Sequence, residues 1–487
     1  MLAWASLAAT SAAETLADAA ALAYQTNPTL QAQRAQLRAT DEEYVQAEAG
    51  LRPTVSASGS YEYAGEQVSQ PGSPSANLAG GTGSAVVSLT QPLYTGGLVT
   101  ARISVAQADI LAGRETLRNT EISVLQSVVG AYLDVRRDGE QLAISQDNVN
   151  VLARQLDETN GKFQAGLLTR TDVAQSEARL AQARSQLAST RAALAVARAA
   201  YAAVVGQDPG DLAPEPPIAA LLPPTVDAAF DAAERDNPQL RQAIYAEEGA
   251  AARLAQAKSQ TRPTASVSAQ YGYVGAQEGI SAGGGFGSIG SVMESELGGS
   301  ITANVSVPLF NGGLYASQIR QAAEQDNVAR IGVETQRRQV LQAVSQAWNQ
   351  LLGARASLAA DEAQVKSDTV AYEGVREEQK VGLRTVLDVL NAEQELEQSQ
   401  LALVGARHDE YVAAAAVLAA MGALDARALI PGAAVYDPKA NFERLRHAPG
   451  ALPWDRAVQA LDRIGAPKPT PAPPPSPPGE IVRTAGQ

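Results

Sequence analysis

The sequence lacks several residue types that common functional sites require. It has no cysteine and only two histidines among 487 residues, which excludes a disulfide framework, a thiolate metal site and a cysteine nucleophile. The 52 acidic residues outnumber the 38 basic ones, a net charge of −14 that argues against a binder of nucleic-acid backbones. Only 5% of the residues are aromatic although 45% are hydrophobic. Thin layers of closely packed helices suit this composition better than a thick core.

Long apolar runs are also missing. No stretch after the N-terminus approaches the roughly 18–20 apolar residues of a membrane-spanning helix, so only strands are expected to cross a membrane. Residues 1–13 are apolar and uncharged, and Ser11-Ala12-Ala13 fits the small-x-small cleavage rule. We interpret residues 1–13 as a residual signal peptide that is cleaved before Glu14. The alternative is the first turn of a buried helix.

The same motifs occur twice in the same order. Asn27-Pro28 and Arg52-Pro53 return 210 residues later as Asn237-Pro238 and Arg262-Pro263. The segment QPLYTGGL at 91–98 returns as VPLFNGGL at 307–314, and GLLTRTD at 166–172 returns as GLRTVLD at 382–388, both 216 residues later. This duplication predicts two copies of one structural unit. The change of offset places an insertion of six residues in the second copy.

Each copy contains two segments in which apolar and polar residues alternate. These segments are 55–63 and 84–90 in the first copy, and 265–273 and 300–307 in the second. Alternation with period two predicts four amphipathic strands of roughly ten residues, long enough to cross a bilayer when tilted. The alternative is a half-buried sheet of a soluble protein. Since a membrane barrel needs at least about eight strands, several chains would have to contribute.

Most of the remaining sequence spaces large apolar residues by seven. The series runs from Val128 to Phe163 and from Val173 to Tyr201, and the second copy repeats it from residue 344 onward. This spacing predicts left-handed coiled-coil packing of long helices. We expect helices of about 65, 39 and 23 residues in each copy, so that one helix of ~100 Å lies beside two shorter ones stacked end to end.

The chain resembles the TolC family of outer-membrane channel-tunnel proteins in a series of motifs that occurs twice. These motifs are Asn-Pro, Arg-Pro followed by a strand, Pro-Leu-aromatic-x-Gly-Gly, and Gly-Leu-x-Thr-x-x-Asp. The resemblance covers about residues 14–432. It implies a mainly α protein with membrane β: a duplicated β-strand pair plus long coiled-coil helical hairpins. The family is a homotrimer whose twelve strands form one β-barrel, continuous with an α-helical barrel in the periplasm.

The resemblance also implies a function and partners. It predicts a passive exit duct in the cell outer membrane, serving a type I secretion system or a multidrug efflux pump, with no enzymatic activity and no cofactor. A periplasmic membrane-fusion adaptor protein and an inner-membrane ABC or RND-type transporter would open it. The alternative from another class is a periplasmic coiled-coil adaptor or structural protein with a soluble β-domain. Protein and small-molecule cargo both remain open.

The chain divides according to this scheme. The first repeat is expected at 14–208 and the second at 225–432, joined by a proline-rich linker at 209–224. A C-terminal periplasmic segment at 433–465 precedes a proline-rich tail at 466–487, whose composition predicts disorder.

The resemblance assigns roles at the periplasmic tips of the hairpins. Gly166 and Gly382 would form the tip turns. Asp388 would place three carboxylates at the pore constriction, and Asn391 stands there in place of the family's usual second acid. Fewer charges in the constriction are therefore expected.

A latch between hairpins is expected at the same tips. Arg384 would bond Thr171 or Asp172 of a neighbouring hairpin, and Gln379 replaces a tyrosine that often takes part, which weakens the latch. Helix capping is the competing role, because Thr169-x-x-Asp172 and Thr385-x-x-Asp388 both have the spacing of a capping box.

Four tyrosines are candidates for an aromatic girdle at the membrane surface. Tyr61 and Tyr63 end one alternating segment, and Tyr271 and Tyr273 end its counterpart. Paired aromatics near a strand end are typical of membrane interfaces, and a soluble adaptor would not need them. No metal or nucleotide site is expected from the motifs.

Overall fold

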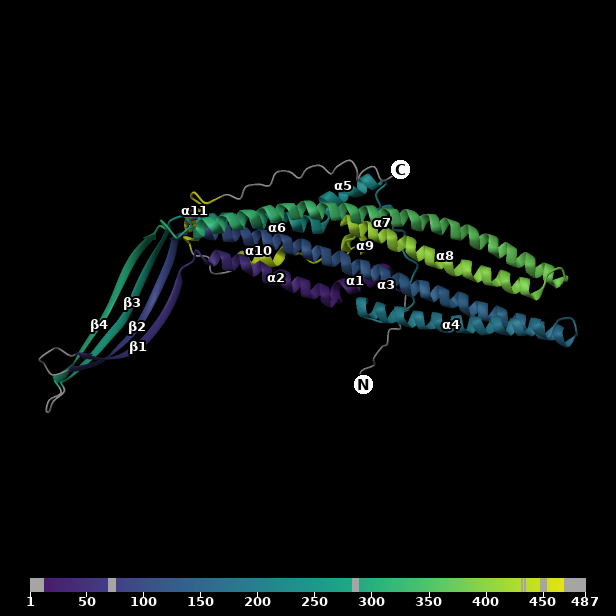
Figure 1. The fold of residues 1–487 in the computed structure, drawn as a ribbon, viewed down its shortest axis with the longest axis horizontal. Helices are drawn as coiled ribbons and strands as arrows, with labels where there is room; N and C mark the ends of the chain where they lie inside the picture. The colour runs from purple at the N-terminus through teal and green to yellow at the C-terminus, as the bar shows by residue number, and fades with distance from the viewer. Residues whose placement is uncertain are drawn as a thin grey trace, which may run out of the picture.

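The computed structural model describes residues 13–68, 76–282, 289–430, 432, 435–446 and 453–467. The molecule is elongated (Figure 1): long helices run side by side over most of its length, and a four-stranded sheet extends from one end. At the other end the long helices turn back on themselves as two hairpins. Among the described residues no helix is both long enough and apolar enough to cross a membrane.

The two sequence copies fold into the same order of elements. The first copy comprises α1 (Leu16–Thr26), α2 (Pro28–Ala49), β1 (Thr54–Val68), β2 (Ala76–Tyr94), α3 (Leu98–Gln164) and α4 (Arg170–Val205). The second comprises α5 (Val226–Asp236), α6 (Pro238–Ser259), β3 (Thr264–Ala282), β4 (Ile289–Ser306), α7 (Leu314–Lys380) and α8 (Val386–Met421). A short 3₁₀ turn (Ala219–Leu221) joins the copies, and α9 (Ala426–Leu429), α10 (Ala440–Arg446) and α11 (Asp455–Asp462) follow them.

The long helices agree closely with the lengths expected from the heptads. α3 and α7 have 67 residues each, α4 and α8 have 36, and α2 and α6 have 22. The α3·α4 and α7·α8 pairs form the two hairpins, and α2 and α6 pack along α3 and α7. The end-to-end stacking of shorter helices beside a long one is therefore confirmed.

The Asn-Pro motifs make the joints between the stacked helices. Asn27 caps α2 by accepting hydrogen bonds from the backbone of Thr29 and Leu30, with Pro28 at the first helical position. Its side-chain nitrogen donates to the carbonyl of Val204 in the last turn of α4, at 3.1 Å. Asn237 makes the equivalent bond to Ala420 of α8, at 2.8 Å. One side chain thus starts one helix and ties it to the end of another.

The sheet is antiparallel throughout, in the order β1-β2-β3-β4. Its strands contain 15 to 19 residues, so the expected length of roughly ten residues was wrong. The clear alternation ends at Tyr63 and Tyr273, but backbone pairing continues beyond both, from Ala64↔Gly80 and Val274↔Glu296 outward. Backbone ladders need no side-chain periodicity, which is why the pattern underestimated the strands.

The main core lies in the middle of the helical part, where α1 and α5 pack against the long helices and α9 packs against α1. Tyr132 and Tyr201 are fully buried there. The hydroxyl of Tyr132 donates to the carbonyls of Glu14 and Ala213, and that of Tyr201 donates to the carboxylate of Glu14 at 2.6 Å. Glu14 thereby fastens the start of the first copy to the segment that joins the two copies.

Candidate functional site

One face of the sheet is apolar across all four strands. Val55 pairs with Leu89, Leu89 pairs with Ala269, and Ala269 pairs with Ile301. Residues paired across neighbouring strands lie on the same face, so these four define one apolar face. In the isolated chain it is open to solvent, with Ile301 81% exposed. An exposed apolar face of this extent marks a surface that contacts lipid or protein.

The opposite face is polar. Ser56 lies beside Ser88 and Ser60 beside Ser84, with 2.8 Å between the hydroxyl oxygens of each pair. Thr90 and Ser268 continue this row from β2 to β3. A sheet with one apolar and one hydroxyl-lined face is suited to separate lipid from an aqueous lumen.

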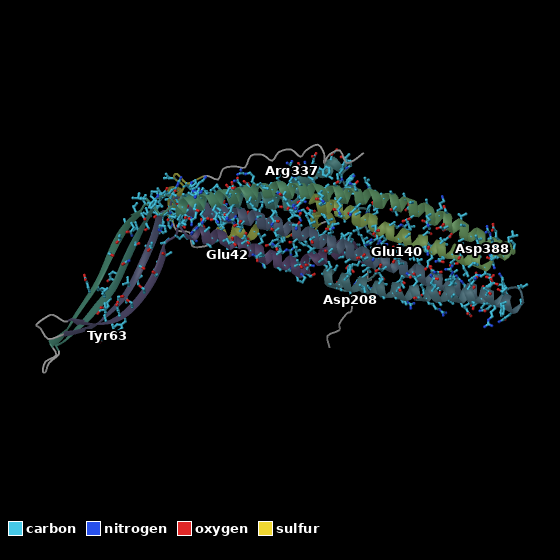
Figure 2. All side chains as sticks on the ribbon, viewed as in Figure 1. Glu42, Tyr63, Glu140, Asp208, Arg337 and Asp388 are labelled. Carbon is cyan, nitrogen blue, oxygen red and sulfur yellow. The ribbon has the colours of Figure 1, made fainter. Side chains whose placement is uncertain are left out.

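The four tyrosines all lie on the apolar face. Tyr61 pairs with Gly83 and Tyr271 with Val87, and Tyr63 and Tyr273 follow two positions further along the same strands. Eight residues separate Val55 from Tyr63, or ~26 Å of strand, close to the ~25 Å apolar band of membrane barrels. The tyrosines thus lie at the far edge of the alternating region, with the strands continuing past them (Figure 2, Tyr63).

Glycine makes room for these rings. A Cβ atom on Gly81 would lie 2.5 Å from the phenol oxygen of Tyr61, and one on Gly275 would lie 2.7 Å from that of Tyr273. Both rings therefore lie flat along the sheet over a neighbouring glycine. The alternating pattern indicated the tyrosines, but it did not predict the contacts of their rings with the glycines.

The strand-to-helix junctions differ between the copies. The turn glycines Gly96, Gly97, Gly312 and Gly313 all have positive φ, between 66° and 87°. In the first copy a Cβ on Gly96 would meet Arg262 at 2.8 Å, whereas in the second copy Gly312 and Gly313 have open space around them. Next to these, Leu309 and Phe310 are 92% and 90% exposed. Within the described part of the chain, the second junction therefore lacks the cover that the first one has.

The C-terminal segment covers part of the junction in the first copy. Asp462 of α11 is fully buried and points its carboxylate at the start of α3. Its two oxygens accept hydrogen bonds from the backbone and hydroxyl groups of Thr95 and Thr100 and from the backbone of Gly97, at 2.7 to 3.3 Å. Gly97 has no side chain to cap α3, so this distant carboxylate caps the helix instead.

The hairpin tips lie at the opposite end of the molecule from the sheet (Figure 2, Asp388). Gly166 and Gly382 follow α3 and α7 with φ of 74° and 82°, a left-handed conformation that favours glycine. The next helix begins four residues later in each hairpin, at Arg170 and at Val386.

Both tip carboxylates cap those helices, as the competing interpretation predicted. The Asp172 carboxylate accepts hydrogen bonds from the backbone and hydroxyl of Thr169, and Asp388 does the same with Thr385, at 2.7 to 2.9 Å. The threonine hydroxyls accept in return from the aspartate backbone, which completes two capping boxes. Hydrogen bonds from the Thr385 backbone and hydroxyl hold the pKa of Asp388 below its ordinary value, so it carries a charge at neutral pH.

Arg384 has a partner within its own hairpin. Its guanidinium Nε lies 2.7 Å from a carboxylate oxygen of Glu378, and this hydrogen bond raises the pKa of Arg384. Within the described part of a single chain it bonds neither Thr171 nor Asp172. Gln379 is half-buried in the last turn of α7. A latch to a neighbouring hairpin thus stays a prediction about a second copy of the chain.

A different residue joins the two hairpins of one chain. Arg179 of α4 donates one hydrogen bond to Asn391, at 2.9 Å, and another to Gln394, both on α8. Arg179 and Gln394 line a groove between the hairpins together with Asn148 and Glu397. Sequence reasoning missed Arg179, because nothing in the heptads indicates how one hairpin is rotated against the other.

A half-buried polar pair lies beside this groove. The hydroxyl of Tyr372 on α7 donates to the carboxylate of Glu393 on α8. Burial raises the pKa of both groups, while Arg376 and Arg154 nearby counteract the rise for Glu393. Among the described residues no group of side chains is arranged to hold a metal ion.

Comparisons with known proteins agree with this geometry. A family model described as outer membrane efflux protein matches residues 19–207 and 229–423, which are the two copies. Outer membrane efflux protein BepC of Brucella suis biovar 1 (strain 1330) is 34% identical over 433 residues, covering 89% of this chain and 91% of the relative. Outer membrane protein TolC of Escherichia coli (strain K12) is 26% identical over 329 residues, covering 65% and 64%.

A solved structure shares the fold. The crystal structure of the Campylobacter jejuni CmeC outer membrane channel superimposes with a TM-score of 0.71 at 14% identity, covering 89% of each chain. The mainly helical architecture with one small antiparallel sheet is thus that of outer-membrane channels.

Proposed function

The chain belongs to the outer membrane efflux protein family, and from this membership we propose that three copies together form the exit duct of a type I secretion system or a multidrug efflux pump. The protein is an outer-membrane efflux or secretion channel, a conduit and not an enzyme, with its helical part in the periplasm. The soluble adaptor alternative is not favoured, because the matched relatives are outer-membrane efflux and secretion proteins.

The sheet is the observation that supports a trimer, because it has one apolar face, one polar face and edge strands open to further pairing. Among the strands that the structure describes, β1 and β4 each have a neighbour on one side only. Free edges with exposed apolar residues invite further strand pairing. Three such sheets, joined β4 to β1, give twelve strands with the apolar face toward lipid and the serine-lined face toward the lumen. Tyr61, Tyr63, Tyr271 and Tyr273 would then form the girdle at one membrane surface.

The helical hairpins would continue this lumen through the periplasm. The seven-residue spacing and the open outer faces of α7 allow neighbouring chains to pack as a closed ring of helices. The tips, farthest from the membrane, would meet a periplasmic adaptor and an inner-membrane ABC or RND-type transporter, which supply the energy that the duct lacks.

The constriction would lie where the tips of the second hairpins converge. Three Asp388 carboxylates at one narrow opening attract cations, because like charges in a confined, poorly screened site raise the local cation concentration. Asn391 adds no charge, so one acidic ring is expected. Arg384 would latch each hairpin to Thr171 or Asp172 of the next chain, with Gln379 contributing little.

Conductance in planar bilayers tests this proposal. The Asp388→Ala channel should be blocked less by multivalent cations added from the periplasmic side, and the Arg384→Ala channel should conduct more because its tips relax outward. Thr385→Ala is the matched control for block, since it breaks the same capping box and leaves the Asp388 carboxylate in place. If multivalent cations block the wild-type and Asp388→Ala channels equally, Asp388 only caps α8 and does not line the constriction.

A further inference from the structure

The helix α11 lies where the sheet meets the helical part (Figure 1), and one of its faces is buried there. Val458, in the middle of α11, is 5% exposed and packs in a cluster with Leu51 and Val99. Asp462, four residues later and so on the same face, caps α3 as described above. These contacts fix how α11 is rotated about its own axis.

A second face of α11 is apolar and exposed. Trp454, Ala457 and Leu461 follow one another at intervals of three and four residues, which places them on one side of the helix. Ile464 continues this spacing in the turn that follows, where its backbone N–H donates to the carbonyl of Leu461. Within the described part of the chain Trp454 is 50%, Leu461 48% and Ile464 64% exposed. Three large apolar side chains on one exposed face indicate a surface that binds a partner.

The end of α11 contacts the apolar face of the sheet. The pairing of β2 with β3 shifts by one residue just before Tyr94, at a β-bulge, so that Tyr94 pairs with Ala265. Ala265 lies four residues before Ala269 on the same strand and therefore on the same, apolar face. The hydroxyl of Tyr94 donates to the carbonyl of Ile464 at 3.3 Å. The residue that ends the exposed face of α11 is thus bonded to the edge of the apolar face of the sheet.

Tyr94 also indicates the depth of α11. Eight residues of β3 separate its partner Ala265 from Tyr273, or ~26 Å of strand, close to the ~25 Å apolar band of membrane barrels. Such a band carries aromatic residues at both edges. With the membrane position proposed above, on which this inference rests, Tyr273 marks one membrane surface and Tyr94 the other. Since the long helix α3 begins just after Tyr94, α11 lies at the periplasmic surface.

The place of α11 favours lipid over a neighbouring chain as its partner. α11 contacts β2, an inner strand with β1 on one side and β3 on the other. Neighbouring chains of the proposed trimer join at the edge strands β1 and β4, away from β2. Arg456 and Arg463, seven residues apart, are exposed on a third side of α11. An apolar face with tryptophan, flanked by arginines, is typical of helices that lie in a membrane surface with their charges at the lipid headgroups.

We propose that α11 lies in the surface of the periplasmic leaflet of the outer membrane, with its apolar face among the phospholipid acyl chains and its two arginines at the phosphates. The Asp462 cap connects this contact to the start of α3. Each α11 of the channel therefore holds the junction between sheet and helices at a fixed depth in the membrane.

Trp454 is the reporter for a direct test. The chain has three tryptophans, so Trp4→Phe/Trp348→Phe leaves Trp454 alone. The full chain is placed in nanodiscs of phosphatidylethanolamine and phosphatidylglycerol, part of which carries bromine near the headgroup end of its acyl chains and quenches tryptophan on contact. Trp454 should lose most of its emission, and bromine at the far ends of the acyl chains should quench it less. Emission that neither brominated lipid changes would overturn the proposal, and a blue-shifted but unquenched emission would assign the cover to protein.

Two further reporters separate the place of α11 from that of the sheet. In a chain that also carries Trp454→Phe, Ile301→Trp puts the reporter on the apolar face of the sheet, and Val196→Trp puts it on the exposed surface of α4, at a distance from the sheet (Figure 1). Brominated lipid should quench the first and spare the second. If Ile301→Trp is quenched and Trp454 is not, the place of α11 is refuted and the membrane sheet stands. If neither is quenched, the proposed membrane position of the sheet fails as well.

The arginines are tested by the headgroup of the brominated lipid. At equal amounts, brominated phosphatidylglycerol should quench Trp454 more than brominated phosphatidylcholine, because the anionic lipid gathers near Arg456 and Arg463. Arg456→Gln/Arg463→Gln should remove this difference and keep the quenching that the apolar contact causes. Arg235→Gln, at an exposed arginine of α5, is the matched control and should leave the difference unchanged. Equal quenching by the two lipids in the chain with both arginines would refute their contact with the phosphates.

Discussion

Replacing Asp462 by alanine should loosen the start of α3 in the first copy. The Asp462 carboxylate accepts five hydrogen bonds from Thr95, Gly97 and Thr100, and it is 0% exposed. Losing a helix cap costs about 1 kcal/mol, and leaving buried donors without an acceptor adds about 1–3 kcal/mol. We therefore expect the first turn of α3 to lose about 2–4 kcal/mol of local stability.

Hydrogen–deuterium exchange resolved by residue measures this loss. A change of about 2–4 kcal/mol corresponds to roughly 30- to 700-fold faster exchange of the protected amides that open locally at the start of α3. Asp462→Asn keeps one acceptor oxygen and should show a smaller increase. Amides at the start of α7 serve as the internal control, because Gly313 has no capping side chain and open space surrounds it.

Exchange at the start of α3 that is no faster in Asp462→Ala than in the wild type would refute this reasoning. The cap would then be satisfied by other groups, and the C-terminal segment would not tie the sheet to the helices. Faster exchange at α3 and α7 alike would point instead to a general loss of stability.

Two further predictions concern the tips. Tyr372→Phe removes the hydroxyl that donates to the half-buried carboxylate of Glu393, so thermal unfolding should shift downward by the equivalent of about 1–3 kcal/mol; an unchanged midpoint would show that water replaces the hydroxyl. The Asp388 cap should be pH-dependent: its folded pKa lies below the ordinary value of 3.8, so its stabilisation is complete above pH 3.8 and is lost as the pH falls through the lower, folded pKa. Exchange of the first α8 amides between pH 5 and pH 2 measures it, and Asp388→Ala should abolish the dependence.

The helical part could be predicted from the sequence because its signals are local. Heptads gave the lengths of α3 and α4 to within a few residues, and the Thr-x-x-Asp spacing gave both capping boxes. The Asn-Pro motif marked the joint at Asn27, although its bond to Val204 could not be foreseen. Each of these features depends on residues within one or two helical turns.

The missed features depend on contacts between distant segments. The strands extend past Tyr63 and Tyr273 because neighbouring strands provide backbone partners there. The bonds from Arg179 to Asn391 depend on how two hairpins are rotated against each other, and the cap by Asp462 depends on where the C-terminal segment docks.

The most direct test of the central claim is the number of chains in one detergent-extracted channel. Native mass spectrometry of the protein purified from outer membranes should give three chain masses, because each chain contributes only four strands to the sheet. A monodisperse monomer that keeps its β-structure would contradict the account, since four strands cannot close a membrane barrel alone.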